Sequence, residues 1–140
     1  MIYVMKMTCS TISLNVDDVS ASRAFLLKHF GFHDLMADEQ DTFASLGHSD
    51  TSMTVVFVRR GCEVLPEDFR DQWPQGVILA FTVEDLEQEE KRLRAEGVPI
   101  TLPIVEEPWG ERLFMVTDPN GIRIEVLTWN AAGSAGAGAA

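Results

Sequence analysis

Two stretches of the chain repeat one pattern of hydrophobic and polar positions. Residues 12–19 read ISLNVDDV, an alternating strand followed by two acidic residues and an apolar residue that can open a helix. Residues 79–86 read LAFTVEDL, the same order of residue types 67 positions further along. Each copy continues as a helical stretch that ends on glycine, at Gly31 and at Gly97. The repeat predicts two similar modules, with a site lying between them.

The alternation also predicts which residues share a face. In the first strand, residues 8–16, the set that should pack on the following helix is Ser10, Ile12, Leu14 and Val16. The opposite set is Cys9, Thr11, Ser13 and Asn15. In the last strand, residues 122–129, the set expected away from the helices is Arg123, Glu125, Leu127 and Trp129. These two opposite sets are therefore candidates to line a binding site.

The remaining elements follow from shorter signals. Asp17 or Asp18 is a candidate N-cap of the first helix, and the second helix is expected near residues 85–96. Further strands are expected near residues 41–46, 52–59, 100–102 and 113–117. Residues 61–75 are expected to form a linker with a short turn starting at Pro66, and residues 118–121 (DPNG) a tight turn.

Length and composition fit one domain of residues 1–130. Module one is expected at about 8–60 and module two at about 76–130, and 46% of the 140 residues are apolar. The segment 131–140 holds only Ala, Gly and one Ser, so we expect it to be disordered. No membrane span or signal peptide is predicted, and two cysteines without ligand-like spacing suit reduced thiols, which predicts a cytoplasmic protein.

The net charge of the chain limits the kinds of molecule that it is expected to bind. Eleven basic residues against 22 acidic residues give a net charge of −11, and a nucleic-acid binder needs a positive surface. The charge therefore argues against nucleic acid as a partner. It is compatible with a cationic small molecule, although acidity also serves solubility alone.

The ending of the second module carries the most specific resemblance. Residues 108–112 (PWGER) and 118–125 (DPNGIRIE), together with the repeat, resemble the vicinal oxygen chelate superfamily over about residues 8–129. That superfamily includes glyoxalase I, extradiol dioxygenases, fosfomycin-resistance enzymes and bleomycin-resistance proteins. The resemblance implies an α+β fold of two tandem βαβββ modules, which form a paired, cup-shaped mixed β-sheet with helices on the outside.

The resemblance also implies positions for a divalent metal. The enzymes of the family carry a His at the start of each module's first strand and a carboxylate on each module's last strand. Here the His positions hold Thr11 and Ile78, and the second-module carboxylate is Glu125. The first-module carboxylate position falls near Thr54 or Val55. One carboxylate, even with Cys9 nearby, is too few donors, so we expect no metal and no cofactor.

A ligand site is expected in the cup instead. The residues expected to line it are Thr11, Ser13, Phe57, Ile78, Ala80, Trp109, Arg112, Phe114, Glu125 and Leu127. Trp109 either stacks on a flat ligand or anchors its own loop. Glu125 either binds a cationic ligand or pairs with Arg123, Arg112 or a hydroxyl group.

The sequence therefore favours a metal-free protein that binds and sequesters an antibiotic or natural product, resembling the bleomycin-resistance type. We expect no catalytic residues and a homodimer, because pairing two chains buries sheet edges. One alternative is a divalent-metal-dependent lyase, isomerase or dioxygenase of the glyoxalase type with displaced ligands. Others are a metal-free enzyme with Glu125 as general base, and a regulatory or structural module.

Overall fold

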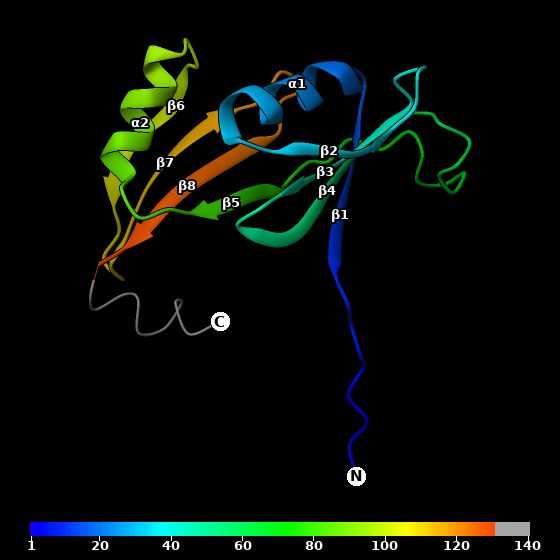
Figure 1. The fold of residues 1–140 in the computed structure, drawn as a ribbon, viewed down its shortest axis with the longest axis horizontal. Coiled ribbons are helices and arrows are strands. Elements are labelled where there is room, and N and C mark those ends of the chain that lie inside the picture. Colours follow the sequence, from blue (N-terminus) through cyan, green and yellow to red (C-terminus); the bar gives the residue numbers. More distant parts are fainter. Residues whose placement is uncertain (131–140) are drawn as a thin grey trace. The chain divides into compact units, whose positions relative to one another are not determined.

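The computed structural model describes residues 1–130, so the expected disorder of the segment 131–140 lies outside the described residues. The chain divides into two compact units. Unit 1 comprises Met1–Pro74, and unit 2 begins at Gln75. Each unit is an α+β module with its own sheet and helix (Figure 1).

Unit 1 has the order strand, helix and three strands. Its elements are β1 (Ser10–Val16), α1 (Val19–Phe30), β2 (His33–Ala37), β3 (Phe43–His48) and β4 (Thr51–Arg59). The four strands form one sheet in the order β1-β4-β3-β2. The β1–β4 pair is parallel and the other pairs are antiparallel, so the sheet is mixed.

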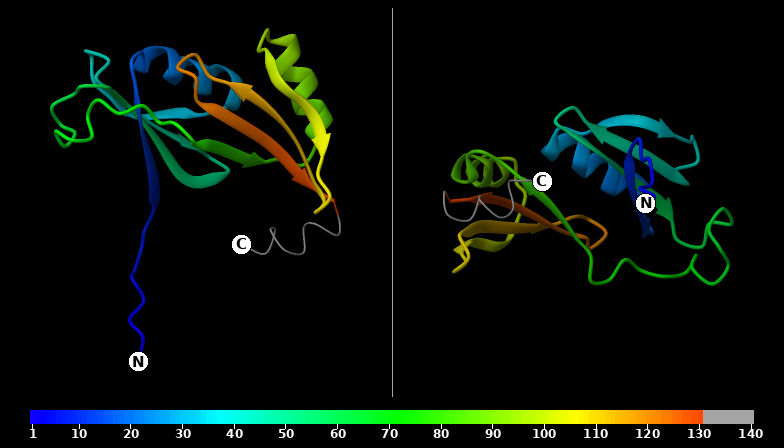
Figure 2. Two further views of the ribbon diagram at one scale, coloured as in Figure 1. Left: turned by 180° about the vertical axis from the view of Figure 1, so that it is seen from behind. Right: turned by 90° about the horizontal axis from the view of Figure 1, so that it is seen from below.

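Unit 2 repeats this order and topology. Its elements are β5 (Ile78–Thr82), α2 (Leu86–Ala95), β6 (Ile100–Glu106), β7 (Glu111–Thr117) and β8 (Arg123–Trp129). The sheet order β5-β8-β7-β6 matches that of unit 1, again with a parallel outer pair, β5–β8. The βαβββ modules expected from the repeat are therefore confirmed. Figure 2 shows each module from two further sides.

Both helices start on an aspartate. For the first helix, this settles the choice between Asp17 and Asp18 in favour of Asp18. The Asp18 side chain accepts a hydrogen bond from the Ala21 backbone N–H, and the Asp85 side chain accepts one from Gln88. These carboxylates satisfy N–H groups that the first turn leaves unpaired. Gly31 ends α1 in the left-handed conformation, at φ 73°, which a residue without Cβ adopts at no steric cost.

One sheet face in each unit packs on its helix. In unit 1 this core contains Leu14 and Val16 from β1, Leu26 from α1 and Phe57 from β4, each at most 2% exposed. The equivalent core of unit 2 holds Leu79, Leu86, Leu93, Phe114, Ile124 and Val126. The alternation thus predicted the buried Leu14 and Val16 of β1 and the buried core positions of β8, because strand side chains point to opposite faces in turn. Ser10, which was expected on the helix-facing side, is exposed.

The segment 61–75 packs on unit 1 rather than hanging between units. The buried Asn15 side-chain amide donates hydrogen bonds to the carbonyl oxygens of Phe69 and Gln72, both at 3.2 Å. The Arg60 guanidinium lies over the Trp73 ring, 4.7 Å from its centroid. The expected turn at Pro66 is present, since its carbonyl oxygen accepts from the backbone N–H groups of the two residues Phe69 and Arg70.

The sequence missed one strand, β2. All five of its residues, HDLMA, are exposed, so no alternation of buried and exposed positions marks it. It pairs only with β3, and that pairing contains an irregularity between Asp34 and Met36. The strands β6 and β7 also run longer than the predicted ranges 100–102 and 113–117. Among residues 1–130, no helix is long and apolar enough to cross a membrane.

Candidate functional site: the distal face of unit 2

The unit 2 sheet has a second face that points away from the core on α2, here called the distal face. Its members alternate with the buried core residues and lie opposite one another in the strand register: Ile78, Ala80 and Thr82 of β5; Arg123, Glu125 and Leu127 of β8; Glu111, Leu113, Met115 and Thr117 of β7. The face therefore mixes small, apolar, hydroxyl and charged side chains, a composition suited to holding and orienting an organic ligand.

The turn at residues 118–121 fixes the register of this face. The carboxylate of the buried Asp118 accepts hydrogen bonds from the backbone N–H groups of Asn120 and Ile122, at 2.9 and 2.8 Å. Gly121 closes the turn at φ 87°, where a side chain would be strained. The hairpin then sets Met115 opposite Glu125, so the predicted turn positions the acidic residue of the site.

Glu125 has an acidic neighbour on the same face. Burial raises the pKa of the Glu125 carboxyl above its ordinary value, and the nearby charge of Glu111 and a hydrogen bond to Glu111 raise that pKa further. Two carboxylates this close repel each other, which makes ionisation of Glu125 less favourable. A cationic group of a ligand placed beside the pair would relieve this repulsion.

Trp109 joins this pair from the turn before β7. Its indole Nε1–H donates a hydrogen bond to Oε1 of Glu111 at 3.0 Å, while 60% of the residue stays exposed. The turn is held by the Glu107 backbone N–H, which donates to the Glu111 carbonyl oxygen at 2.8 Å. Gly110, at φ 96°, completes it. Trp109 thus presents an aromatic surface that its own hydrogen bond to Glu111 orients.

Three predicted site residues lie on the distal face together with Glu125. Ile78 is opposite Arg123, Ala80 is opposite Glu125, and Leu127 is opposite Leu113. Ile78 is 49% exposed, an unusual position for a large apolar side chain on a strand. The structure thus brings together the strand positions that the alternation assigned to one face of unit 2.

Two predicted residues of unit 2 lie on the other face. Phe114 is fully buried in the core next to Val126, its partner on β8. Arg112 forms an ion pair with Glu87 of α2, which raises the pKa of Arg112 and lowers that of Glu87. Arg112 and Phe114 therefore belong to the helix side of the sheet, because even-numbered β7 positions point toward α2.

The predicted site residues of unit 1 divide in the same way. Thr11 and Ser13 are exposed on β1, on the face opposite the helix-facing Leu14. Phe57 is 1% exposed and lies beside Leu14 in the strand register, inside the core on α1. Phe57 is therefore a core residue of unit 1 and not a lining residue.

Sequence reasoning missed Glu111 as a partner of Glu125. It considered Arg123, Arg112 or a hydroxyl group for that role, but Arg112 pairs with Glu87. Within the part of the chain that the structure describes, Glu125 forms no ion pair with Arg123. The alternation along β7 contained part of this information, because it places Glu111 and Met115 on the same face of the sheet. The strand register adds that Met115 lies opposite Glu125.

The metal positions implied by the resemblance can be tested against the strand register. Ala80 pairs with Glu125, and the residue 67 positions before Ala80, Ser13, pairs with Val56. Val56 is therefore the topological counterpart of Glu125, rather than Thr54 or Val55. The donor set is then Thr11, Val56, Ile78 and Glu125, with a single carboxylate. Such a set does not fit a catalytic divalent metal, which takes three or more protein ligands.

Over residues 1–130, no three side chains of His, Cys, Asp or Glu come together as ligands of a metal ion would. Cys9, the residue directly before β1, is exposed and carries a free thiol.

The sequence matches a known protein family along most of its length. Residues 8–126 match the Glyoxalase/Bleomycin resistance protein/Dioxygenase superfamily, and the chain belongs to this superfamily. The resemblance drawn from the repeat and from residues 118–125 is therefore confirmed. A comparison with curated proteins found no match.

Several solved structures resemble the chain in fold. A possible glyoxalase from Bacillus cereus is 27% identical, with a TM-score of 0.64 over 87% of this chain and 99% of that one. TnmS3, an antibiotic-binding protein from Streptomyces sp. CB03234, is 21% identical, with a TM-score of 0.70 over 91% and 100%. Lactoylglutathione lyase from Agrobacterium tumefaciens is 16% identical, with a TM-score of 0.71 over 88% and 94%. The last two likenesses establish the fold alone.

Proposed function

We propose that this protein binds a small organic molecule of the antibiotic or natural-product type on the distal face of unit 2 and sequesters it without chemical change. The observation that carries the proposal is the chain of contacts from Trp109 through Glu111 to Glu125. It combines an exposed aromatic ring with a carboxyl pair, on a face that lacks a metal-binding donor set. The likeness to TnmS3 supports the proposal, because that protein has the same fold and binds an antibiotic.

The chemistry of the face suggests the ligand class. An aromatic ring system would stack on Trp109, and a basic nitrogen would be attracted to the carboxyl groups of Glu111 and Glu125. The surplus of acidic residues, a net charge of −11, would attract a cation over longer distances. We therefore propose a planar, cationic ligand.

Free thiols at Cys9 and Cys62 support a reducing compartment such as the cytoplasm.

A thermal-shift screen of cationic aromatic antibiotics, followed by calorimetric titration of each hit, tests the proposal. Bound hits should be recovered unchanged by mass spectrometry. The Trp109→Ala variant should bind them more weakly, whereas Trp73→Ala, which alters a tryptophan of unit 1, should bind as the wild type does. Turnover of a hit, or equal binding by both variants, would contradict sequestration at this face.

One observation favours a second function, a metal-free enzyme. A carboxyl whose pKa is raised by burial and by a like-charged neighbour is a better general acid or base than an ordinary carboxyl. In that case Glu125 would move a proton on a substrate bound beside Trp109. Glu125→Gln would then abolish turnover while leaving the affinity for a neutral substrate nearly unchanged, which separates this function from sequestration.

A further inference from the structure

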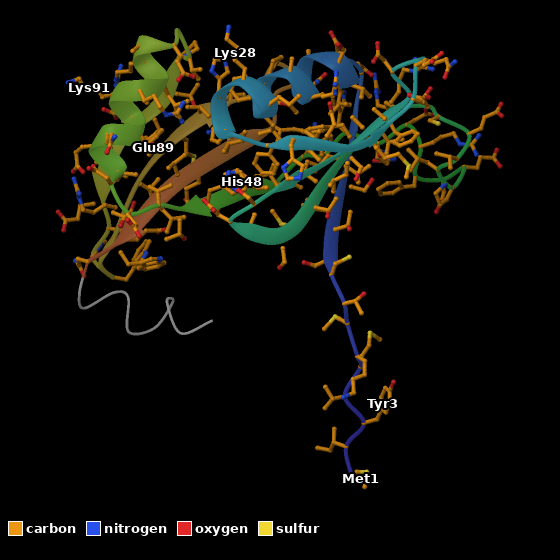
Figure 3. The ribbon with its side chains drawn as sticks, viewed as in Figure 1. Met1, Tyr3, Lys28, His48, Glu89 and Lys91 are labelled. Carbon is orange, nitrogen blue, oxygen red and sulfur yellow. The ribbon has the colours of Figure 1, made fainter. Side chains whose placement is uncertain are left out.

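Among the described residues of the distal face, only Arg123 is basic, and its side chain is exposed. In the strand register it lies between Ile78 of β5 and Thr117 of β7, two residues before Glu125 on the same side of β8. Lys91, by contrast, projects from α2, on the other side of the unit 2 sheet (Figure 3). A guanidinium group therefore shares the distal face with the carboxyl groups of the proposed ligand site.

The guanidinium group of Arg123 has no ion-pair or hydrogen-bond partner among residues 1–130. Each of the other arginines has one, which is a carboxylate for Arg23, Arg60, Arg92, Arg94 and Arg112 and a backbone carbonyl oxygen for Arg59 and Arg70. The chain holds 22 acidic residues against 11 basic ones, so carboxylates are plentiful. Arg123 thus keeps all its N–H donors available to a ligand.

Glu125 is well placed to neutralise Arg123, yet it contacts Glu111 instead. Residues two apart on a strand lie about 7 Å apart on one face, which two long side chains can span. The Glu125 carboxyl is nevertheless hydrogen-bonded to Glu111. In the register of β7 with β8, Glu111 lies beyond Glu125 on the side remote from Arg123. The acidic pair is therefore directed away from the cation, and the face keeps its opposite charges apart.

This arrangement is unfavourable for the protein alone. Two neighbouring carboxyl groups resist ionisation, whereas an ion pair between Glu125 and Arg123 would relieve that repulsion. Folded proteins place such local conflicts mainly at functional sites, where a ligand resolves them. A ligand would resolve this one by supplying a cation to the two glutamates and an anion to Arg123.

The net charge of −11 limits which anions can reach Arg123. A purely anionic molecule would be repelled by the chain as a whole, whereas a basic nitrogen in the same molecule offsets the repulsion. The backbone positions of Arg123 and Glu125 are about 7 Å apart, and the acidic pair is directed away from Arg123. The two charges must therefore lie on different parts of the ligand, unlike those of an α-amino acid, which flank one carbon.

We propose that the ligand of the distal face is zwitterionic, with its basic nitrogen beside Glu111 and Glu125 and its carboxylate bound by the Arg123 guanidinium. The planar guanidinium offers parallel N–H groups that match the two oxygens of a carboxylate. Ala80, opposite Glu125, leaves room for the ligand between the two charged ends. The inference rests on the proposed function and adds to it the acidic group by which the site selects among flat cationic molecules.

Three dyes built on the same flat ring system test the charge requirement. Tetramethylrhodamine carries a cationic ring system and a free carboxylate, its methyl ester lacks the carboxylate charge, and fluorescein lacks the basic nitrogens. In fluorescence anisotropy titrations, the wild type should bind tetramethylrhodamine about threefold to tenfold more tightly than the ester, and fluorescein most weakly. Equal affinity for tetramethylrhodamine and its ester, or fluorescein bound as tightly as tetramethylrhodamine, would overturn the inference.

A pair of variants assigns the preference to Arg123. Arg123→Gln should remove the preference for tetramethylrhodamine over its ester without weakening the binding of the ester. Arg94→Gln is the matched control, because it removes the same charge from α2 of the same unit and should keep the preference. Circular dichroism checks that both variants fold. A preference that persists in Arg123→Gln would contradict the role of this residue.

The same titrations distinguish failure of this inference from failure of the proposed function. If the ester binds and Trp109→Ala weakens its binding, while the free carboxylate adds no affinity, the ligand site stands and the zwitterionic ligand is refuted. If neither tetramethylrhodamine nor its ester binds, the distal face does not receive flat cationic molecules, and both proposals are contradicted.

Discussion

The carboxyl groups of Glu111 and Glu125 share a hydrogen bond on the distal face of the unit 2 sheet, although they come from different strands. Met115, and not Glu111, is the direct partner of Glu125 in the strand register. The two glutamates therefore meet along a diagonal of the hairpin. Because Trp109 donates a hydrogen bond to Glu111, a substitution of either glutamate should also change the orientation of the Trp109 ring.

The first prediction concerns pH. The folded-state pKa of Glu125 is raised, so the folded protein holds this proton more tightly than the unfolded chain does. This contribution to stability is complete below the unfolded pKa, about 4.3, and is lost as pH rises through the folded pKa. Glu125→Gln should therefore be more stable than the wild type at pH 7 and equally stable at pH 3.5. Urea unfolding at both values measures this.

The control for this prediction is Glu107→Gln, which removes one acidic charge from the neighbouring turn. Its stability relative to the wild type should change less between the two pH values. In addition, Glu111→Gln should lower the pKa of Glu125 in an NMR titration, because a like charge is removed. A constant difference between Glu125→Gln and the wild type across the pH range would contradict the raised pKa of Glu125.

The second prediction separates the two properties of Trp109. Trp109→Phe keeps an aromatic ring but loses the hydrogen bond to Glu111, whereas Trp109→Ala loses both. For a ligand found in the antibiotic screen, Trp109→Ala should weaken binding by about 1–3 kcal/mol and Trp109→Phe by clearly less. Calorimetric titration measures both. Equal losses would assign the effect to the hydrogen bond instead of to stacking.

The third prediction concerns the segment 61–75. Asn15 is 3% exposed and binds the carbonyl oxygens of Phe69 and Gln72. Asn15→Ala leaves both carbonyl groups without this donor, so the free energy of unfolding should fall by about 1–3 kcal/mol. Ser13→Ala, on the same strand face but exposed, should cost far less. If Asn15→Ala is as stable as Ser13→Ala, the amide does not hold the segment.

A fourth prediction compares the two helix starts. Asp18→Ala and Asp85→Ala each remove one capping hydrogen bond of 3.0 Å, and each should destabilise its own unit by about 1 kcal/mol. Hydrogen exchange should show faster opening of α1 in the first variant and of α2 in the second. Equal acceleration in both helices for either variant would mean that the units open together.

The fifth prediction concerns metal. Because the strand register gives a donor set with one carboxylate, ligand binding should be unchanged after exhaustive chelation. Elemental analysis of the purified protein should find no stoichiometric zinc, iron, nickel or manganese. One such ion per chain, together with loss of ligand binding on chelation, would contradict this prediction and favour a metal-dependent enzyme.

The sequence predicted those features that local pattern determines. An acidic cap of the first helix, the turn at residues 118–121 and most of the buried positions of β1 and β8 follow from residue type and period. The strand β2 was missed because both of its sides are exposed. Phe57 and Phe114 were expected in the site because an aromatic residue suits either face, and only the register assigns them to the core.

Contacts between strands were harder to predict than positions within a strand. The pairing of Glu111 with Glu125 depends on how β7 and β8 align, and that alignment depends on the length of the turn between them. Likewise, the counterpart of Glu125 in unit 1 is Val56, while counting along the sequence suggested Thr54 or Val55. In both cases the missing information is the register, which the turn and the whole sheet determine together.

Because the two units have the same strand order, each position in one sheet has an equivalent position in the other. A duplicated gene segment can lose a functional group in one copy while the other retains it, provided that both still fold. Val56 and Glu125 are such a pair, one apolar and one acidic at equivalent places in two sheets. Protein engineering could use this divergence, since Val56 is the position at which a second acidic group could be grafted onto an existing scaffold.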